Sequence, residues 1–108
     1  MILVISEKEW QGQVVELAQW LGYEHIYHTW NSVHSPAGFP DLIILDGKVM
    51  IVAELKREDG ILSPEQYFWL VAFLEVTPAV YLWKPSDFES VIKVLMANRK
   101  IESKVVEA

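Results

Sequence analysis

Cysteine is absent from the chain, which excludes disulfide bridges and thiolate zinc sites and fits a reducing cytoplasm. No apolar run reaches the roughly 18–20 residues that a membrane-spanning helix needs. The opening segment MILVISEKEW also lacks the basic flank of a secretory signal peptide. We therefore expect a cytoplasmic protein with no membrane partner, and we expect no nucleotide cofactor.

Basic residues are scarce as well. Nine Lys and Arg stand against 15 Asp and Glu, which gives a formal net charge of −6 over 108 residues. Because phosphate binding draws most of its affinity from Lys and Arg, this average charge disfavours a nucleic-acid partner. It does not exclude a local basic patch, and an acidic cluster that binds a divalent cation would itself contribute to the negative sum.

Apolar residues are plentiful: 52% of the chain is hydrophobic and five residues are Trp, as expected for one globular domain over residues 1–108. Periodicity and turn residues predict the elements. We expect helices over 7–21, 64–75 and about 86–97, strands over 24–30, 41–45, 48–56 and 79–83, and a loop over 31–38. The tail 98–108 either extends the last helix or frays. The predicted fold class is α/β, a single domain with a central mixed β-sheet flanked by helices in the order αβββαβα.

Three capping boxes support the helix starts. In each of them a serine precedes a Glu or Gln by three positions, so that each side chain can satisfy a backbone N–H of the first turn. The pairs are Ser6 with Glu9, Ser63 with Gln66, and Ser86 with Glu89.

The hairpin between residues 41 and 56 carries charged residues in an otherwise apolar stretch. The pair Asp46-Gly47 favours a two-residue type I′ turn. Counting back from that turn puts Asp41 opposite Val52 and makes it a diagonal neighbour of Glu54, about 7–8 Å away at Cα. A divalent cation can fill such a gap between carboxylates. A three-residue turn would instead put Asp41 on the other face of the sheet.

Two close carboxylates repel each other unless a cation neutralises them. Oxygen ligands without Cys favour Mg²⁺ or Mn²⁺ over zinc. Lys56 shares a face with Glu54 and could orient a water or balance charge on a transition state, which suggests metal-assisted hydrolysis of a phosphodiester. The alternative is a solvent-exposed ion pair at a strand end, worth about 0–1 kcal/mol. The hairpin alone leaves both interpretations open.

Four further residues are candidates for this site. Glu7 precedes apolar residues of the first helix by three and seven positions and so lies on its apolar face, although a first-turn Glu can also simply complement the helix dipole. Gln66 either reaches the site or only caps its helix. His25 and His28 point to opposite strand faces and cannot chelate one ion. We expect His28 to be a hydrogen-bonding partner near the site, and His34 to lie in a loop that touches substrate.

The order of several short motifs resembles a known family. These motifs are SEKEWQ at 6–11, GFPDL at 38–42, AELK at 53–56, G-x-L-S-P-E-Q at 60–66 and YLWKPSDF at 81–88. In this order and at these spacings they resemble the VRR-NUC (virus-type replication-repair nuclease) domain of the PD-(D/E)XK nuclease superfamily. The resemblance covers about residues 6–88 and implies a restriction-endonuclease-like core.

The resemblance also implies roles for individual residues. The metal, Mg²⁺ or Mn²⁺, would be held by Asp41, Glu54 and the backbone carbonyl of Leu55. Lys56 would position or activate the attacking water. Glu7 would reach the metal directly or through water, and Gln66 corresponds to the Gln that opens the helix after the core strands. Candidates for gripping DNA are Arg57, Lys84, His28, His34 and the 31–37 loop.

The function implied is a metal-dependent DNA endonuclease of DNA repair, selective for branched DNA or four-way (Holliday) junctions. Bare domains of this length in the family are typically phage-encoded, and several are homodimers. The implied location is therefore the cytoplasm of a bacterial cell or a phage-infected host. The chain departs from the family by lacking an attached DNA-binding region and by reading EVTPAV at 75–80, where a glycine is usual. The alternative function is a catalytically weak nucleic-acid-binding accessory subunit that requires a partner protein.

Overall fold

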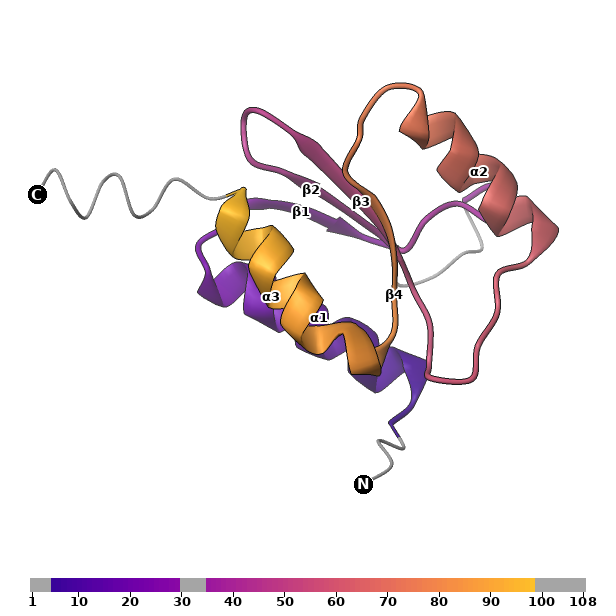
Figure 1. Cartoon of the computed structure of the whole chain (residues 1–108), viewed down its shortest axis with the longest axis horizontal. Helices are drawn as coiled ribbons and strands as arrows, with labels where there is room; N and C mark the ends of the chain where they lie inside the picture. The colour runs from indigo at the N-terminus through magenta and orange to yellow at the C-terminus, as the bar shows by residue number, and fades with distance from the viewer. Residues whose placement is uncertain (1–4, 30–34, 99–108) are drawn as a thin grey trace, which may run out of the picture.

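A four-stranded mixed sheet lies between helices in the computed structural model of the chain, which describes residues 5–29 and 35–98 (Figure 1). The elements along the described chain are α1 (Glu7–Trp20), β1 (His25–His28), β2 (Leu42–Leu45), β3 (Met50–Leu55), α2 (Pro64–Leu74), β4 (Val80–Trp83), the 3-10 turn η2 (Pro85–Asp87) and α3 (Phe88–Ala97). An α/β fold with a mixed sheet and three α-helices is thus confirmed for these residues. Predictions for residues 30–34, including the end of the predicted strand over 24–30, and for the tail beyond residue 98 lie outside them.

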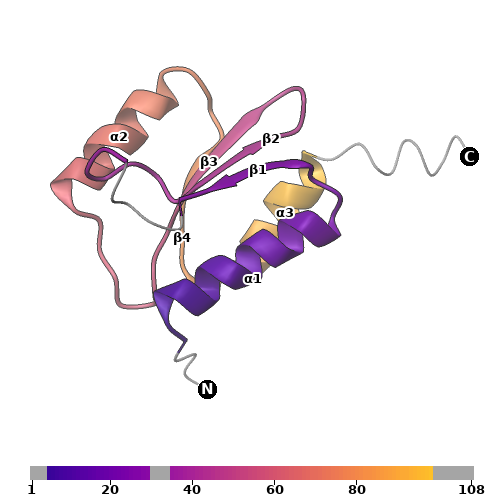
Figure 2. The ribbon, with the colours of Figure 1, turned by 180° about the vertical axis from the view of Figure 1, so that it is seen from behind.

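The strands follow one another across the sheet in the order β1-β2-β3-β4. The first three pair antiparallel, and β3 pairs parallel with β4 after a crossover through α2. Helices α1 and α3 cover one face of the sheet and α2 lies on the other, as the views from both sides show (Figures 1 and 2). No helix among the described residues is long and apolar enough to span a membrane.

The core lies between the sheet and the α1–α3 layer. Alternate residues of β2 and β3 point into it, and it is completed by apolar residues of both helices. Its fully buried members include Leu42, Ile44, Ile51, Ala53 and Leu55 from the strands, and Trp10, Val14, Ala18, Val91 and Leu95 from the helices. Trp10 also donates from Nε1 to the carbonyl of Trp83 at 3.0 Å, which ties the first turn of α1 to the end of β4. This contact sets where the α1 N-terminus meets the sheet.

Two of the three predicted capping boxes are present. Ser6 and Glu9 exchange backbone–side-chain hydrogen bonds of 3.0 Å at the start of α1. Ser63 and Gln66 do the same at the start of α2, with Pro64 at the first helical position. These local patterns therefore determine both helix starts.

The third predicted capping box is wrong. Ser86 lies inside the 3-10 turn η2, before α3, and its hydroxyl donates to Glu58 Oε2 at 2.7 Å. The Ser86 backbone N–H donates to the other Glu58 oxygen at 2.9 Å. Asp87 instead accepts from the Lys84 N–H at 2.9 Å and closes the turn. A glutamate 28 residues away in the sequence thus takes the serine that the local pattern had assigned to a helix cap.

The predicted two-residue hairpin turn is also wrong. Leu45 pairs with Met50, so the connection is a four-residue loop over 46–49. The Asp46 side chain holds this loop because its Oδ1 accepts the N–H groups of Lys48 at 2.9 Å and Val49 at 2.8 Å. An Asp at this place can satisfy the backbone of a wider turn, and it does so here in preference to the tight type I′ form.

The observed register brings the two acids, Asp41 and Glu54, closer together than the predicted register does. The observed pairs include Leu42 with Ala53, and extending them by one residue sets Asp41 directly opposite Glu54. The prediction had set Asp41 opposite Val52, two residues along the same strand. A shift of two residues keeps every side chain on its face. The expectation that the two acids share a face is therefore confirmed, and they are closer neighbours than predicted.

Candidate metal-binding site

Asp41 is held at the open end of the hairpin by both neighbouring strands. Its Oδ2 accepts the backbone N–H of Leu55 at 2.9 Å, and its carbonyl accepts the N–H of Thr29 at 2.9 Å. The preceding residue, Pro40, is fully buried. Because the backbone on both sides is fixed, the Asp41 carboxyl has a defined position beside β3.

Glu54 is a buried carboxyl, and only one of its two oxygens has a hydrogen-bond donor among the described residues. The residue is 1% exposed. Gln66 donates from Nε2 to Glu54 Oε2 at 2.9 Å, and the Lys56 ammonium lies 3.9 Å from the same oxygen. Glu54 Oε1 is buried, and no hydrogen-bond donor among the described residues reaches it. An ionised carboxylate in this position would be costly without a further positive partner.

The pKa of Glu54 also reflects the lack of a sufficient positive partner. Burial is the main reason why the pKa of the Glu54 carboxyl is raised to about 9. The negative charge of Asp41 and a hydrogen bond between the two carboxyls raise this pKa further, and Lys56 lowers it. Two carboxyl groups can share a hydrogen bond only when one of them carries a proton. Without a cation, therefore, Glu54 holds a proton at neutral pH.

The pair formed by Asp41 and Glu54 fits a divalent cation. The cation would replace the proton of Glu54 and would give its Oε1, which no described donor reaches, a partner. Both side chains offer oxygen only, which suits Mg²⁺ or Mn²⁺. Among residues 5–29 and 35–98 no group of three or more His, Asp and Glu side chains is arranged to hold a metal. Within the described part of the chain, the side-chain donors are thus two carboxylates.

Glu7 faces this pair from the first turn of α1. Burial raises the pKa of its carboxyl, and the charges of Lys56, Asp41 and Arg57 also act on it. Its own charge in turn acts on Glu54. Glu7 is half-buried, as expected for a residue on the inward side of its helix. Glu7 lies near the two acids without forming a three-residue cluster with them.

Lys56 and Gln66 complete the surroundings of Glu54. The Lys56 side chain is 13% exposed, so it is a largely buried partner of a buried acid and not a fully solvated ion pair. Gln66 has both of the roles that the sequence left open. Its Oε1 accepts from Ser63 N at 2.8 Å as a helix cap, while its Nε2 donates to Glu54.

Gly38 positions this site, and no local pattern in the sequence indicated that role. Its φ is +82°, and a Cβ there would come within 2.4 Å of the α2 backbone and 2.7 Å of Gln66 N. The next residue, Phe39, packs edge-on against Trp69 and Phe73 at centroid distances of 5.1 and 6.0 Å. The segment leading to Asp41 is thus pressed against the helix that carries Gln66.

Two of the predicted DNA-gripping residues, Arg57 and Lys84, lie close to acidic side chains. Arg57 is exposed, but its guanidinium forms a two-pronged ion pair with Asp59. Lys84 lies near enough to Glu58 and Asp59 to lower the pKa of both carboxyls, with smaller effects than their own hydrogen bonds. The 57–59 loop thus carries one basic and two acidic residues, and both Arg57 and Lys84 lie close to these acids.

His25 and His28 differ in burial, as expected for residues on opposite faces of a strand. His25 is exposed and His28 is buried. Burial lowers the pKa of the His28 imidazole, while the negative charge of Asp41 acts to raise it, which locates His28 near the site. His34 lies outside the described residues, as does the part of the 31–37 loop before residue 35.

No family model, curated protein or solved structure matches this chain. Support for a function therefore comes from the motifs and from the geometry of the site alone.

Proposed function

We propose that the chain is a divalent-metal-dependent endonuclease that hydrolyses phosphodiester bonds in DNA, built on a restriction-endonuclease-like core of the VRR-NUC type. One observation carries the proposal. Two carboxyls from adjacent strands meet at Asp41 and Glu54, and the buried Glu54 has an oxygen with no donor among the described residues. A largely buried lysine, Lys56, lies beside them. A surface ion pair would have no need of such burial.

Asp41 and Glu54 would hold Mg²⁺ or Mn²⁺, together with the carbonyl of Leu55. A bound cation would neutralise charge on the phosphate and lower the pKa of an attacking water. Lys56 would orient that water or oppose charge that develops on the phosphate. Glu7, which lies close to the two acids but outside ligand range of a shared ion, would act through water.

Gln66 would act as a positioning residue. Its hydrogen bond engages Glu54 Oε2 and leaves Oε1 without a donor among the described residues. Gly38 allows the close approach that brings Gln66 there. The arrangement thus holds the Glu54 carboxyl in one orientation before any cation binds, which reduces the reorganisation needed on binding.

Branched DNA, including four-way junctions, is the substrate class that the motif resemblance favours. The acids near Arg57 and Lys84 reduce the attraction of that loop for a phosphate backbone. We therefore expect the affinity for DNA to be weak and its dependence on salt to be shallow, because few cations there are free to neutralise phosphates. The alternative, an accessory subunit that binds nucleic acid without cutting it, makes no use of the two inward acids.

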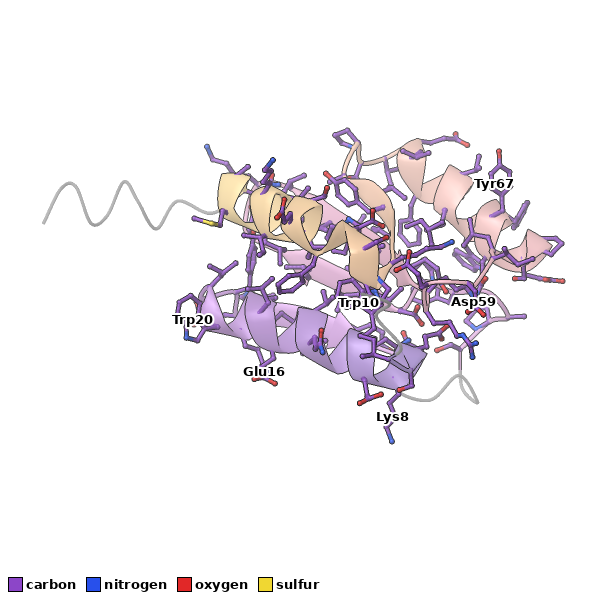
Figure 3. The ribbon with its side chains drawn as sticks, turned by 60° about the horizontal axis from the view of Figure 1, so that its bottom comes forward. Lys8, Trp10, Glu16, Trp20, Asp59 and Tyr67 are labelled. Carbon is purple, nitrogen blue, oxygen red and sulfur yellow. The ribbon has the colours of Figure 1, made fainter. Side chains whose placement is uncertain are left out.

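Cleavage assays should separate these functions. Labelled four-way junction, flap and linear duplex are incubated with the protein and Mg²⁺, Mn²⁺ or EDTA. We expect metal-dependent cleavage that Asp41→Asn or Lys56→Met reduces at least about 100-fold, because each removes charge from the reacting centre. Matched controls are Glu16→Gln and Lys8→Met, on exposed positions of α1 whose side chains point away from the body of the protein (Figure 3).

The controls should cut like the wild type. Absence of metal-dependent cleavage on every substrate would reject the endonuclease. Binding without cleavage, unchanged in Asp41→Asn, would support the accessory subunit instead.

A further inference from the structure

The loop that leaves β3 brings an arginine close to the proposed metal site. Arg57 follows Lys56 directly and is exposed. In the views from both sides this loop passes the start of α1, where Glu7 lies (Figures 1 and 2). The charges of Arg57 and Glu7 accordingly act on each other. A DNA phosphate next to the one at the metal would therefore come within reach of Arg57.

Asp59 engages the Arg57 guanidinium in the geometry that a phosphate would take. Arg57 Nε and Nη2 donate to Asp59 Oδ1 and Oδ2 at 2.5 and 3.0 Å. Arginine makes the same two-pronged contact with carboxylates and with phosphates. The two side chains are 60% and 72% exposed, so water screens the pair and it adds little to the stability of the fold. The pair can therefore open when a phosphate competes for Arg57.

The other acid of this loop, Glu58, is engaged elsewhere. Its two oxygens accept hydrogen bonds from the Ser86 backbone N–H at 2.9 Å and from the Ser86 hydroxyl at 2.7 Å. These bonds tie the loop to η2, which begins directly after Lys84. Lys84 is thereby placed beside the loop, and its charge acts on Asp59. No ion pair among the described residues involves Lys84, so Asp59 has a second cation near it that is not yet paired.

We propose that Asp59 is an exchangeable occupant of a phosphate-binding site on Arg57: when DNA binds, a backbone phosphate takes the two-pronged contact and the Asp59 carboxylate passes to Lys84. The inference rests on the proposed function for the identity of the ligand, a DNA phosphate. Before the exchange one cation is paired and one is not. After it the phosphate and Asp59 have one cation each, and Glu58 keeps its bonds to Ser86 throughout.

The exchange gives the two cations different roles. Arg57 contacts DNA, whereas Lys84 receives the displaced acid. Loss of Lys84 should then weaken DNA binding only while Asp59 is present, because an absent acid needs no new partner. Two cations that both bound phosphates directly would act independently of Asp59. Each phosphate contact adds about 0.9 to the slope of log affinity against log salt, and competition by Asp59 hides part of the contribution of Arg57.

Fluorescence anisotropy of a labelled four-way junction, between about 50 and 200 mM NaCl in EDTA, measures binding without cleavage. We expect Asp59→Asn to raise the affinity about 3- to 10-fold and to steepen the salt slope by up to about 0.9, because Arg57 is then free for a phosphate. The matched control is Glu65→Gln, which removes an exposed acid of α2 that forms no ion pair with a described residue. It should raise the affinity less than about 2-fold.

Double substitutions separate the exchange from a general effect of charge. In an Arg57→Met background, Asp59→Asn should raise the affinity no more than the control does, because the cation that it frees is gone. Lys84→Met should weaken binding about 3-fold in the wild type and less than about 2-fold in an Asp59→Asn background.

The exchange would be overturned if Asp59→Asn acted no more strongly than Glu65→Gln, or acted equally in the Arg57→Met background. An equal effect of Lys84→Met with and without Asp59 would also overturn it. The binding assay contains no metal and is therefore independent of the cleavage assays. Coupled binding without any cleavage would reject the endonuclease and retain the exchange, whereas metal-dependent cleavage without this coupling would reject the exchange alone.

Discussion

Glu54→Gln is expected to stabilise the metal-free protein above pH 7 and to abolish its response to Mg²⁺. The pKa of the buried Glu54 is raised to about 9, whereas in the unfolded chain it is near 4.5. The folded state therefore binds a proton that the unfolded state has lost. The free energy of unfolding of the wild type should fall by about 1.4 kcal/mol for each pH unit across pH 7–8.5. Glutamine cannot ionise, so the variant should lose this slope.

The direction of this slope distinguishes Glu54 from its neighbour His28. The pKa of His28 is lowered by burial, so its contribution to stability grows as pH rises through its unfolded value of 6.5 and is nearly complete above pH 7. Urea unfolding followed by Trp fluorescence in EDTA, from pH 7 to 8.5, isolates the Glu54 effect. Glu16→Gln, on the exposed side of α1, should keep the wild-type slope. Equal slopes in wild type and Glu54→Gln would contradict this assignment.

Added Mg²⁺ should remove most of the pH dependence in the wild type, because Glu54 is then ionised in the folded state as well as in the unfolded state. The cation binds the ionised carboxylates. The stabilisation that about 10 mM Mg²⁺ provides should therefore grow with pH as the proton leaves Glu54. Glu54→Gln should show almost no stabilisation and no cleavage. One substitution would then raise stability and remove function, as is common for residues kept for chemistry.

Gly38→Ala is expected to destabilise the protein by about 3 kcal/mol or more. The positive φ of +82° costs a side chain energy, and the added Cβ meets the α2 backbone at 2.4 Å. A backbone contact cannot move aside as a flexible side chain would. Relief of the clash would shift Gln66 away from Glu54, so cleavage should also fall. Urea unfolding gives the first quantity and the junction assay the second.

Two other glycines separate the causes of this effect. Gly47 has a φ of +91°, and a Cβ added there would meet nothing within 4 Å, so Gly47→Ala tests the backbone conformation alone and should cost about 1–2 kcal/mol. Gly12 lies in α1 with open space around it, and Gly12→Ala should stabilise by up to about 1 kcal/mol. If Gly38→Ala costs no more than Gly47→Ala, the close approach to α2 is not what holds this segment.

Local signals were sufficient where the partners are close in sequence. The boxes of Ser6 with Glu9 and of Ser63 with Gln66 satisfy backbone groups within one helical turn. Ser86 carries an identical local signal and fails, because Glu58 from a distant loop bonds it instead. The difference is tertiary, and nothing within a few residues of Ser86 encodes it.

The candidate site was predictable in its composition and only partly in its geometry. The turn at Asp46 was misjudged, but the error was two residues, so alternation still put Asp41 and Glu54 on one face. The burial of Glu54 and Lys56 depends on how helices pack around the strand ends. The need for Gly38 depends on α2, which approaches from more than 20 positions along the chain. Periodicity carries no information about such an approach.

Calorimetric titration of the metal-free protein with Mn²⁺ at pH 7.5 tests the central claim, that Asp41 and Glu54 together bind one divalent cation. Titrations in buffers with different ionisation enthalpies give the number of protons released. We predict one site per chain and release of close to one proton, because Glu54, with a pKa of about 9, must lose its proton on binding. Asp41→Asn should abolish binding. Absence of binding to the wild type, or binding that persists unchanged in Asp41→Asn, would contradict the account.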